Sequence, residues 1–320
     1  MKFSEEKLKL FAAALSESED QKCKNAIGMV RDALKGLGYT DDNKAIFRLY
    51  DETYAYSLNM RSVAGSKQIK IFIQGSYANN TNVRTQSDVD IAIVQEEVFQ
   101  TQYRSGVTDS NYGFRVADKP MKTFKDEVQE CLVVKFGRDV ERKNKSIKIH
   151  GNTYRKDADT VPCKRYRDYS EDLYNDPKNY IGGIVINADD GTIIINYPEQ
   201  HIFNGRKKNS ETNYYYKKMV RIIKNMRYIM DENYYFSANN VSSFGLESLL
   251  WNVPNEIFNK FNPILRFTFD EIVKYLVSHK NDIHSYKEVN GIKNLCQTQV
   301  DADKYIKFVL DLSKFYEYDI

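Results

Sequence analysis

Two carboxylates separated by one residue stand at the start of an apolar run in this chain of 320 residues. Asp88 and Asp90 lead into Ile91–Val94, whose β-branched residues favour a strand. Alternate residues of a strand project from the same face, so we expect the two carboxylates to lie together. Like charges held that close repel one another unless a cation lies between them. Because carboxylate and phosphate oxygens are preferred ligands of Mg²⁺, the pair predicts a site for this ion.

A polar loop precedes this carboxylate pair and has the residues to hold a phosphate. The run Ile69–Ile73 is typical of a strand, and it leads into Gln74, Gly75 and Ser76. Glycine lets the backbone approach a phosphate closely, and serine adds a hydroxyl and an N–H donor. Each short motif is weak alone, but their order between two apolar strands favours a phosphate-binding loop over a hairpin with a polar tip.

A second group of acidic residues occurs farther along the chain. Asp157 and Asp159 lie two residues apart, and Pro162 follows them, as in a strand that ends or lies at a sheet edge. A third carboxylate beside Asp88 and Asp90 would complete a site for two metal ions. One ion would activate an attacking hydroxyl, and the other would neutralise a triphosphate. The alternative is an edge strand that carries solvated charge.

The order of these motifs resembles that of the polymerase-β-like nucleotidyltransferase superfamily. Within it, the chain is similar to the cGAS/DncV-like nucleotidyltransferases (CD-NTases) of bacterial anti-phage systems, and to their CdnE group. The segments that carry the resemblance, from about Gln74 to Pro254, are QGSYANNT, SDVDIAIV, DADTVPCKR, YPEQHIFNGRKKN, YKKMVRIIKNMRYIM and SSFGLESLLWNVP. The resemblance implies that Asp88, Asp90 and Asp159 are the catalytic residues and bind two Mg²⁺ ions, with Mn²⁺ as a substitute.

A basic segment with helical spacing lies in the second half of the chain. Apolar residues recur with the period of a helix in Tyr214–Met230, and Lys217, Arg221 and Lys224 follow at i, i+4 and i+7 on another face. Charge alone favours a solvated face. The resemblance implies contacts to the donor triphosphate instead. The nucleotide-binding set that it implies is Gln74, Gly75, Ser76, Arg221, Lys224 and Ser243.

The remaining elements are predicted from periodicity. Helices are expected at Ser4–Leu15, Gln21–Leu37, Ala45–Met60, Met121–Phe136, Phe244–Val253, Phe269–Ser278 and Ala302–Phe315. Strands are expected at Lys145–His150, Ile181–Ile186 and Thr192–Tyr197, the last two joined as a hairpin. The polar stretch Gln95–Arg115 is ambiguous. His201 has no partner at metal-ligand spacing, so we expect it to be structural.

These elements and the resemblance predict an α+β fold with two lobes. We expect a polymerase-β-like nucleotidyltransferase lobe with a mixed β-sheet, including the N-terminal helices, over residues 1–208. A helical lobe is expected over residues 209–320. The active site is expected in the cleft between them, where ligands commonly bind.

Composition limits the class of protein. Charged residues make up 28% and hydrophobic residues 42%, which is typical of soluble globular proteins. A net charge of only +3 makes no demand for nucleic acid. Four scattered cysteines predict a reduced, cytoplasmic protein. The charged start MKFSEEKLKLF is unlike a signal peptide, and apolar runs fall short of the roughly 20 residues that span a bilayer.

The leading hypothesis is a template-independent nucleotidyltransferase. As the resemblance implies, it would join nucleoside triphosphates (ATP, UTP or others), release pyrophosphate and close a cyclic di- or trinucleotide. This product would act on a separate effector protein in anti-phage (CBASS) signalling, without a membrane or an obligatory nucleic-acid partner. One alternative adds a nucleotide to RNA, protein or a small molecule. Another is an inactive relative that only binds a nucleotide or partner. The bases, linkage, ring size, activating signal and oligomeric state are not predicted.

Overall fold

The chain forms two compact units. The helical unit comprises Met1–Ser16, Gly75–Thr85 and Glu199–Ile320, and the sheet unit comprises Glu17–Gln74 and Gln86–Pro198. The boundary expected after residue 208 stays a prediction. The computed structural model describes residues 2–14, 16–42, 46–48, 53–63, 67–83, 88–118 and 120–318.

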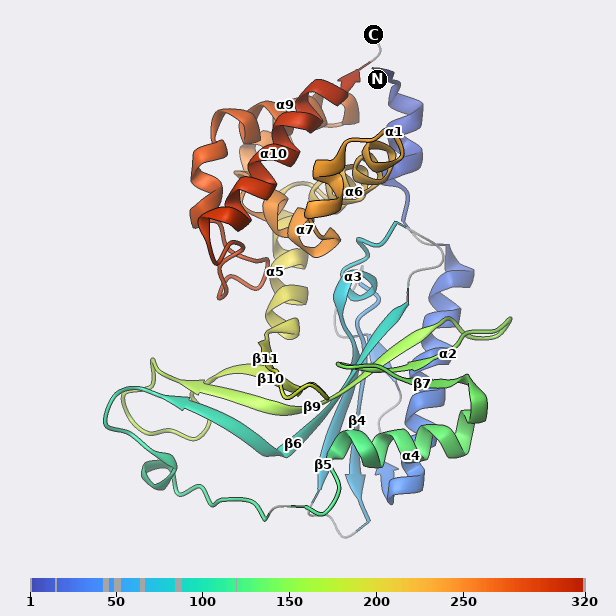
Figure 1. Cartoon of the computed structure of the whole chain (residues 1–320), viewed down its shortest axis with the longest axis vertical. Helices are drawn as coiled ribbons and strands as arrows, with labels where there is room; N and C mark the ends of the chain where they lie inside the picture. The colour runs from blue at the N-terminus through green and yellow to red at the C-terminus, as the bar shows by residue number, and fades with distance from the viewer. Residues whose placement is uncertain are drawn as a thin grey trace. The chain divides into compact units, whose positions relative to one another are not determined.

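A mixed β-sheet organises the sheet unit (Figure 1). Its strands are β2 (Tyr39–Asp41), β3 (Phe47–Arg48), β4 (Tyr56–Ser62), β5 (Gln68–Ile73), β6 (Val89–Tyr103), β7 (Val140–Arg142), β8 (Ile147–Ile149), β9 (Ala158–Tyr169), β10 (Ile181–Asn187) and β11 (Ile193–Asn196). The main path runs β11-β10-β9-β6-β5-β4-β2, and β8 also pairs with β9. The β6–β9 pair is parallel, whereas β5 and β6 are antiparallel.

The central strands are buried on both faces, which explains why Ile91–Val94 is a continuous apolar run. Helices α2 (Glu17–Leu34) and α4 (Phe124–Phe136) contact β5 and β9, respectively. One apolar cluster of the sheet comprises Phe72, Ala92, Val94, Val161, Cys163, Ile184 and Ile186. The packing fixes the strands that carry the acidic residues.

The helix expected over Ala45–Met60 is wrong for the residues that the structure describes. The segment contains β3 and most of β4, while residues 45 and 49–52 lie outside the described ranges. Leu58 and Met60 are both buried, and β4 pairs along its length with β5. Pairing with a neighbouring strand therefore outweighed a weak helical periodicity.

The first part of the ambiguous segment Gln95–Arg115 extends β6. The strand continues beside β9 as far as Tyr103, with a shift of register between Gln95 and Phe99. The predicted hairpin is confirmed as the antiparallel pair β10 and β11, and the strand predicted at Lys145–His150 is confirmed as β8.

The helical unit contains most of the remaining predicted helices. The helices of this unit are α1 (Glu5–Ala12), α3 (Gly75–Ala78), α5 (Pro198–Glu211), α6 (Tyr216–Glu232), α7 (Ser243–Trp251), α8 (Asn255–Asn259), α9 (Leu265–Ser278) and α10 (Gln299–Phe315). The predictions for α1, α6, α7, α9 and α10 are confirmed with small differences at the ends, whereas α3, α5 and α8 were not predicted. Short strands β1 (Lys2–Phe3) and β12 (Glu317–Tyr318) pair in parallel.

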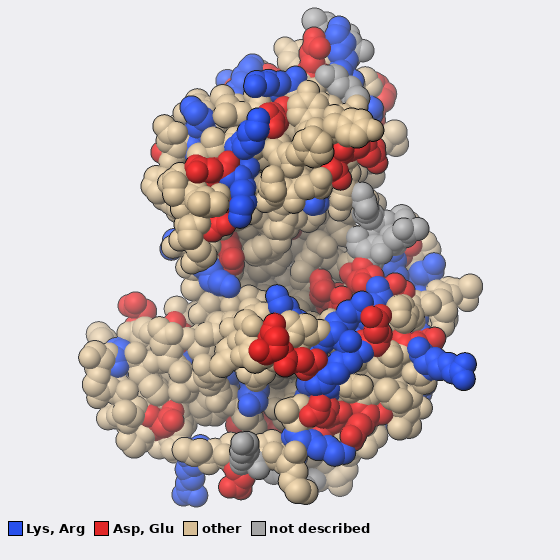
Figure 2. Space-filling model, in the orientation of Figure 1, with Lys and Arg blue, Asp and Glu red and all other residues tan. Residues whose placement is uncertain are grey.

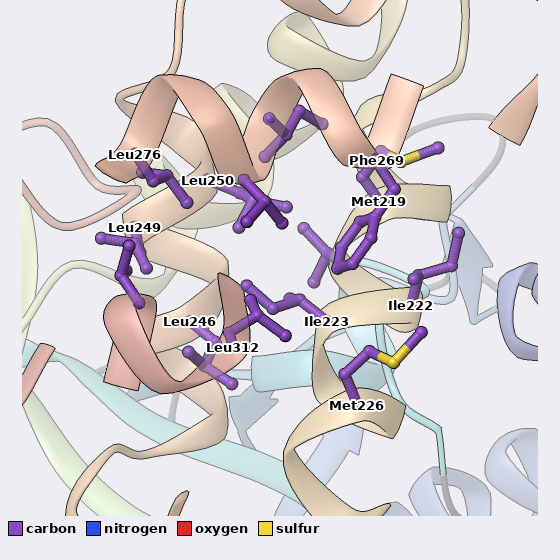
Figure 3. Close-up of a cluster of buried hydrophobic side chains, with 14 of the residues drawn as sticks. Met219, Ile222, Ile223, Met226, Leu246, Leu249, Leu250, Phe269, Leu276 and Leu312 are labelled. Atoms are coloured by element: carbon purple, nitrogen blue, oxygen red, sulfur yellow. The ribbon is translucent and has the colours of Figure 1, made fainter. Parts of the chain in front are cut away.

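One apolar core holds the helical unit together, and α6 contributes a full face to it (Figure 3). The core includes Met219, Ile222, Ile223, Met226, Leu246, Leu249, Leu250, Phe269, Leu276 and Leu312. Burial of a side chain of this size stabilises the fold by roughly 1.5–3 kcal/mol. The apolar face of α6 therefore fixes the direction in which its basic face points.

The surface carries charges of both signs. On the face drawn in Figure 2, acidic and basic side chains are interspersed. Among the described residues, none of the helices combines the length and the apolarity that crossing a membrane requires.

Candidate active site

The three predicted metal-binding carboxylates lie at the starts of two neighbouring strands in the sheet unit. Asp88 directly precedes β6, and Asp90 is the second residue of that strand. Asp159 is the second residue of β9. In the parallel pairing of the two strands, Asp90 and Asp159 are direct partners. Partners of this kind project from the same face of a sheet, so residues far apart in the chain are brought side by side.

Burial and mutual repulsion make this group electrostatically unfavourable as it stands. Burial raises the pKa of Asp90 to about 7, and the charges of Asp159 and Asp88 add to the rise. Burial also raises the pKa of Asp159; Asp88 adds to this rise, while Lys148 opposes it. A cation bound among the carboxylates would favour their charged forms.

Lys148 already supplies part of the missing positive charge. It is the middle residue of β8 and the direct partner of Asp159. Its Nζ donates to Oδ2 of Asp88 at 2.8 Å and lies 3.2 Å from Oδ2 of Asp157. The hydrogen bond to Asp88 raises the pKa of Lys148, which keeps the ammonium charged. Sequence reasoning missed this residue, although its alternation with Ile147 and Ile149 was the available signal.

The chemistry of these carboxylates fits a divalent cation, which oxygen ligands bind well. Their arrangement does not form a finished site: within the described ranges, no group of three or more His, Cys, Asp or Glu side chains is placed to hold a metal ion. One oxygen of Asp88 is bound to Lys148 instead. Asp157 accepts a hydrogen bond from the Gly151 amide, and so is held by its own loop.

The predicted phosphate-binding loop begins at Gln74, whose amide donates to the Asp90 carbonyl at 2.9 Å within the sheet unit. In the helical unit, Gly75 has a φ of +70°, a conformation that favours glycine, and opens the short helix α3. The carbonyl of Ser76 accepts a hydrogen bond from the Thr81 amide at 2.9 Å, which closes the turn. The chain before Asp88, residues 84–87, lies outside the described ranges.

Arg221 of α6 is buried and bound to backbone carbonyls. Its Nε donates to the Ala12 carbonyl at 2.7 Å, and a terminal N–H donates to the Asn80 carbonyl. Lys217 and Lys224 on the same helix are also buried. The solvated basic face that charge alone favoured is therefore wrong.

Lys224 binds the segment that follows the predicted loop. Its Nζ donates to the Thr81 carbonyl and to Oε2 of Glu247, both at 3.0 Å. The side chains of this ion pair are only 2% and 1% exposed. Nε2 of His201 lies 2.9 Å from the other oxygen of Glu247, a contact that fits the structural role expected for this histidine.

Glu247 was missed by the sequence reasoning. A lone acid inside the apolar run Phe244–Val253 was the available signal, because a buried charge needs partners. Ser243, the remaining predicted residue, is the first residue of α7. Its Oγ accepts a hydrogen bond from Arg227 at 3.3 Å.

Two family descriptions match the chain. The cGAS/DncV-like nucleotidyltransferase C-terminal helical domain matches residues 203–317. The nucleotidyltransferase domain matches residues 61–171. The chain is 48% identical over 319 residues to the cyclic GMP-AMP synthase CdnE03 of Staphylococcus schleiferi, covering 99% of this chain and 98% of that protein. It is 34% identical to the cyclic dipyrimidine nucleotide synthase CdnE of Cecembia lonarensis, covering 92% and 90%.

Solved structures agree with this result and confirm the predicted α+β fold. The CdnE c-UMP-AMP synthase of Rhodothermus marinus, solved with Apcpp and Upnpp, matches with a TM-score of 0.74 at 25% identity, covering 97% of this chain and 96% of that chain. The CdnE cyclic dinucleotide synthase of Elizabethkingia meningoseptica, solved with GTP and Apcpp, matches with a TM-score of 0.71 at 31% identity, covering 98% and 99%. The chain therefore belongs to the CdnE group of the cGAS/DncV-like nucleotidyltransferases.

Proposed function

We propose that this protein joins nucleoside triphosphates, releases pyrophosphate and closes a cyclic di- or trinucleotide. The observation that carries the proposal is the pairing of Asp90 with Asp159 beside Asp88. It gathers three carboxylates in a chain that is similar along nearly its whole length to a cyclic nucleotide synthase. Phosphoryl-type transfer needs such charges chiefly for positioning and electrostatic stabilisation.

Asp88, Asp90 and Asp159 would hold two divalent ions, Mg²⁺ or Mn²⁺. When bound, such ions neutralise the triphosphate and make the attacking hydroxyl a stronger nucleophile. Asp90 must lose its proton to take part, so the raised pKa of about 7 favours binding at neutral and higher pH. Oδ2 of Asp88, which accepts a hydrogen bond from Lys148, would have to be released from that bond to bind an ion.

The phosphate contacts are assigned to the loop and to the helical unit. Gly75 and Ser76 would donate backbone N–H groups, with the Ser76 hydroxyl as a further donor, to the donor triphosphate. Gln74 and Ser243 are proposed as polar contacts to the same group. Arg221 and Lys224, which donate hydrogen bonds to the carbonyls of Asn80 and Thr81, are proposed to supply positive charge to the same triphosphate.

ATP and GTP are the first substrate pair to test, because the 48% identical relative is a cyclic GMP-AMP synthase. The other relatives include dipyrimidine and UMP-AMP synthases, so UTP and CTP belong in the same experiment. The cyclic product is proposed to act on a separate effector protein of an anti-phage (CBASS) system.

The test is to incubate the protein with the four labelled triphosphates, alone and in pairs, with Mg²⁺ or Mn²⁺. Ring closure leaves no terminal phosphate, so we expect small products that resist phosphatase and have the mass of a cyclic species. No RNA or other acceptor should be needed. If activity requires an added acceptor, or if every product is destroyed by phosphatase, the protein adds nucleotides to another molecule instead.

A further inference from the structure

We infer that Glu247 is a positioning residue for the phosphate-binding loop, because its carboxylate ties that loop to three helices of the helical unit. The inference rests on the proposed function for the role of the loop. It concerns a residue that lies on α7, outside both the loop and the carboxylate group.

The carboxylate of Glu247 is fully used by its neighbours. Oε2 accepts from the Thr81 hydroxyl at 2.7 Å and from Lys224 of α6 at 3.0 Å. Oε1 accepts from Nδ2 of Asn79 at 3.2 Å and lies 2.9 Å from Nε2 of His201 of α5. All five side chains are buried. Each of these bonds therefore acts where water cannot substitute for it.

The bonds reach the predicted loop through Thr81 and Asn79. The Thr81 amide donates to the Ser76 carbonyl at 2.9 Å, and the Asn79 amide donates to the Gly75 carbonyl at 3.3 Å. A shift of Glu247 would therefore move the two residues that close the turn. Because phosphate donors must be held within a fraction of an ångström, such a shift affects binding as well as folding.

Close packing around Asn79 also indicates that the position of this side chain is fixed. A Cβ at Gly205 of α5 would lie 2.8 Å from Nδ2 and 3.0 Å from Oδ1 of Asn79, so only glycine leaves room for that side chain. This steric observation is independent of the charges of the ion pair.

Stability alone does not explain the charges. A buried ion pair gains little over well-packed apolar residues of similar size, since desolvation offsets the attraction. Burial would by itself raise the pKa of Glu247, but Lys224 and then His201 hold it well below its ordinary value. The group is thus a buried anion, and its partners lead to the loop.

The test compares Glu247→Gln with Asp311→Asn in the full chain. Both substitutions remove the charge of a buried carboxylate in the helical unit and nearly keep the shape of the side chain. Asp311 accepts hydrogen bonds from Ser237 and Lys307, and both of these partners lie outside residues 75–83. It is therefore a control for the general cost of losing a buried charge.

Two readouts separate positioning from stability. In nucleotide-free protein, Glu247→Gln should raise amide hydrogen exchange in residues 75–83 while exchange in α9 stays as in the wild type. The KM for ATP should rise by about tenfold or more, with kcat also lowered, since misplacement near the chemistry is costly. Asp311→Asn should leave loop exchange and KM within about twofold of the wild type. Equal effects of the two variants, or no effect of Glu247→Gln on loop exchange and KM, would overturn the inference.

A second variant covers the case in which Glu247→Gln does not fold. Replacing the pair as Lys224→Met with Glu247→Leu removes both buried charges and should fold. Loop exchange in its nucleotide-free form should still rise, and wild-type exchange would overturn the inference. Failure of the proposed function is a different result: the wild type would give no cyclic product even though these variants changed loop exchange.

Discussion

Charge is balanced in opposite ways in the two units of this protein. In the sheet unit, every interaction that shifts the pKa of Asp90 raises it, and the carboxylates repel one another. In the helical unit, Glu247 is more deeply buried, yet Lys224 and His201 hold its pKa well below the ordinary value. Under the proposed function, a divalent cation would complete the first arrangement. In the second arrangement, the charge of Glu247 is already balanced by Lys224 and His201, and its inferred role is to position the residues around it.

The largest expected effect comes from removing the unbalanced charges. Asp88→Asn combined with Asp90→Asn should lower product formation by at least about a thousandfold, because the ligands for divalent ions are lost. The melting temperature should stay the same or rise slightly, since repelling carboxylates are gone. Product assays and thermal melts check both statements. More than trace product from the double variant would refute the role of these residues.

The second effect is a pH dependence of stability in metal-free protein. Unfolded Asp90 loses its proton near the ordinary value of 3.8, whereas the folded protein keeps it to about 7. Between these values the unfolded state binds fewer protons, so the free energy of unfolding falls as pH rises. Asp90→Asn should remove this contribution, so its gain in free energy of unfolding over the wild type should be larger at pH 8 than at pH 5 by roughly 3 kcal/mol. Denaturant titrations at the two pH values measure it, and an equal gain at both would contradict the assignment.

The third effect concerns Lys148, whose ammonium group is bonded to Asp88 and which we expect to compete with a metal ion for that carboxylate. Lys148→Met should tighten binding of Mn²⁺ in the absence of nucleotide by about tenfold, since one positive charge beside the site is removed. Lys145→Met, at an exposed position nearby, is the matched control. Paramagnetic titration of Mn²⁺ gives the affinities. Weaker binding by Lys148→Met would mean that the lysine supports the site instead of competing for it.

The smallest effect is expected from a steric change in the balanced region. Gly205→Ala adds one methyl group against Asn79 and leaves all the charges in place. We expect the KM for ATP to rise a few-fold and the stability to fall by roughly 1–3 kcal/mol, because the methyl group overpacks the buried Asn79 side chain and the better helix propensity of alanine offsets only part of that cost. Steady-state kinetics and melting curves suffice. An unchanged KM would show that the loop tolerates movement of Asn79.

The carboxylates at the start of β6 could be predicted from the sequence, because the pattern that reveals them involves only residues that are adjacent in the chain. Asp88 and Asp90 stand before a buried apolar run, and the period of a strand places them together. The helix expected over Ala45–Met60 failed for the complementary reason. There the deciding interaction was the pairing of β4 with β5, which the periodicity of one segment does not reveal.

The residues that pair with these charged side chains could not be predicted, because they come from distant parts of the chain. Lys148 meets Asp88 across 60 residues, and Glu247 meets Thr81 across 166. A basic face on α6 was visible in the sequence, but not its burial against the segment around Thr81. The sequence showed which charges exist, and the packing decided which of them are already paired.

The most direct test of this contrast is a crystal structure with Mn²⁺ and a non-hydrolysable ATP analogue, using the anomalous signal to locate the metal. We predict Mn²⁺ bound by Asp88, Asp90 and Asp159, with Lys148 released from Asp88. The bonds from Glu247 to Thr81 and Asn79 should be unchanged. Metal bound away from these aspartates, or an intact Lys148–Asp88 bond with metal and nucleotide in place, would contradict the account.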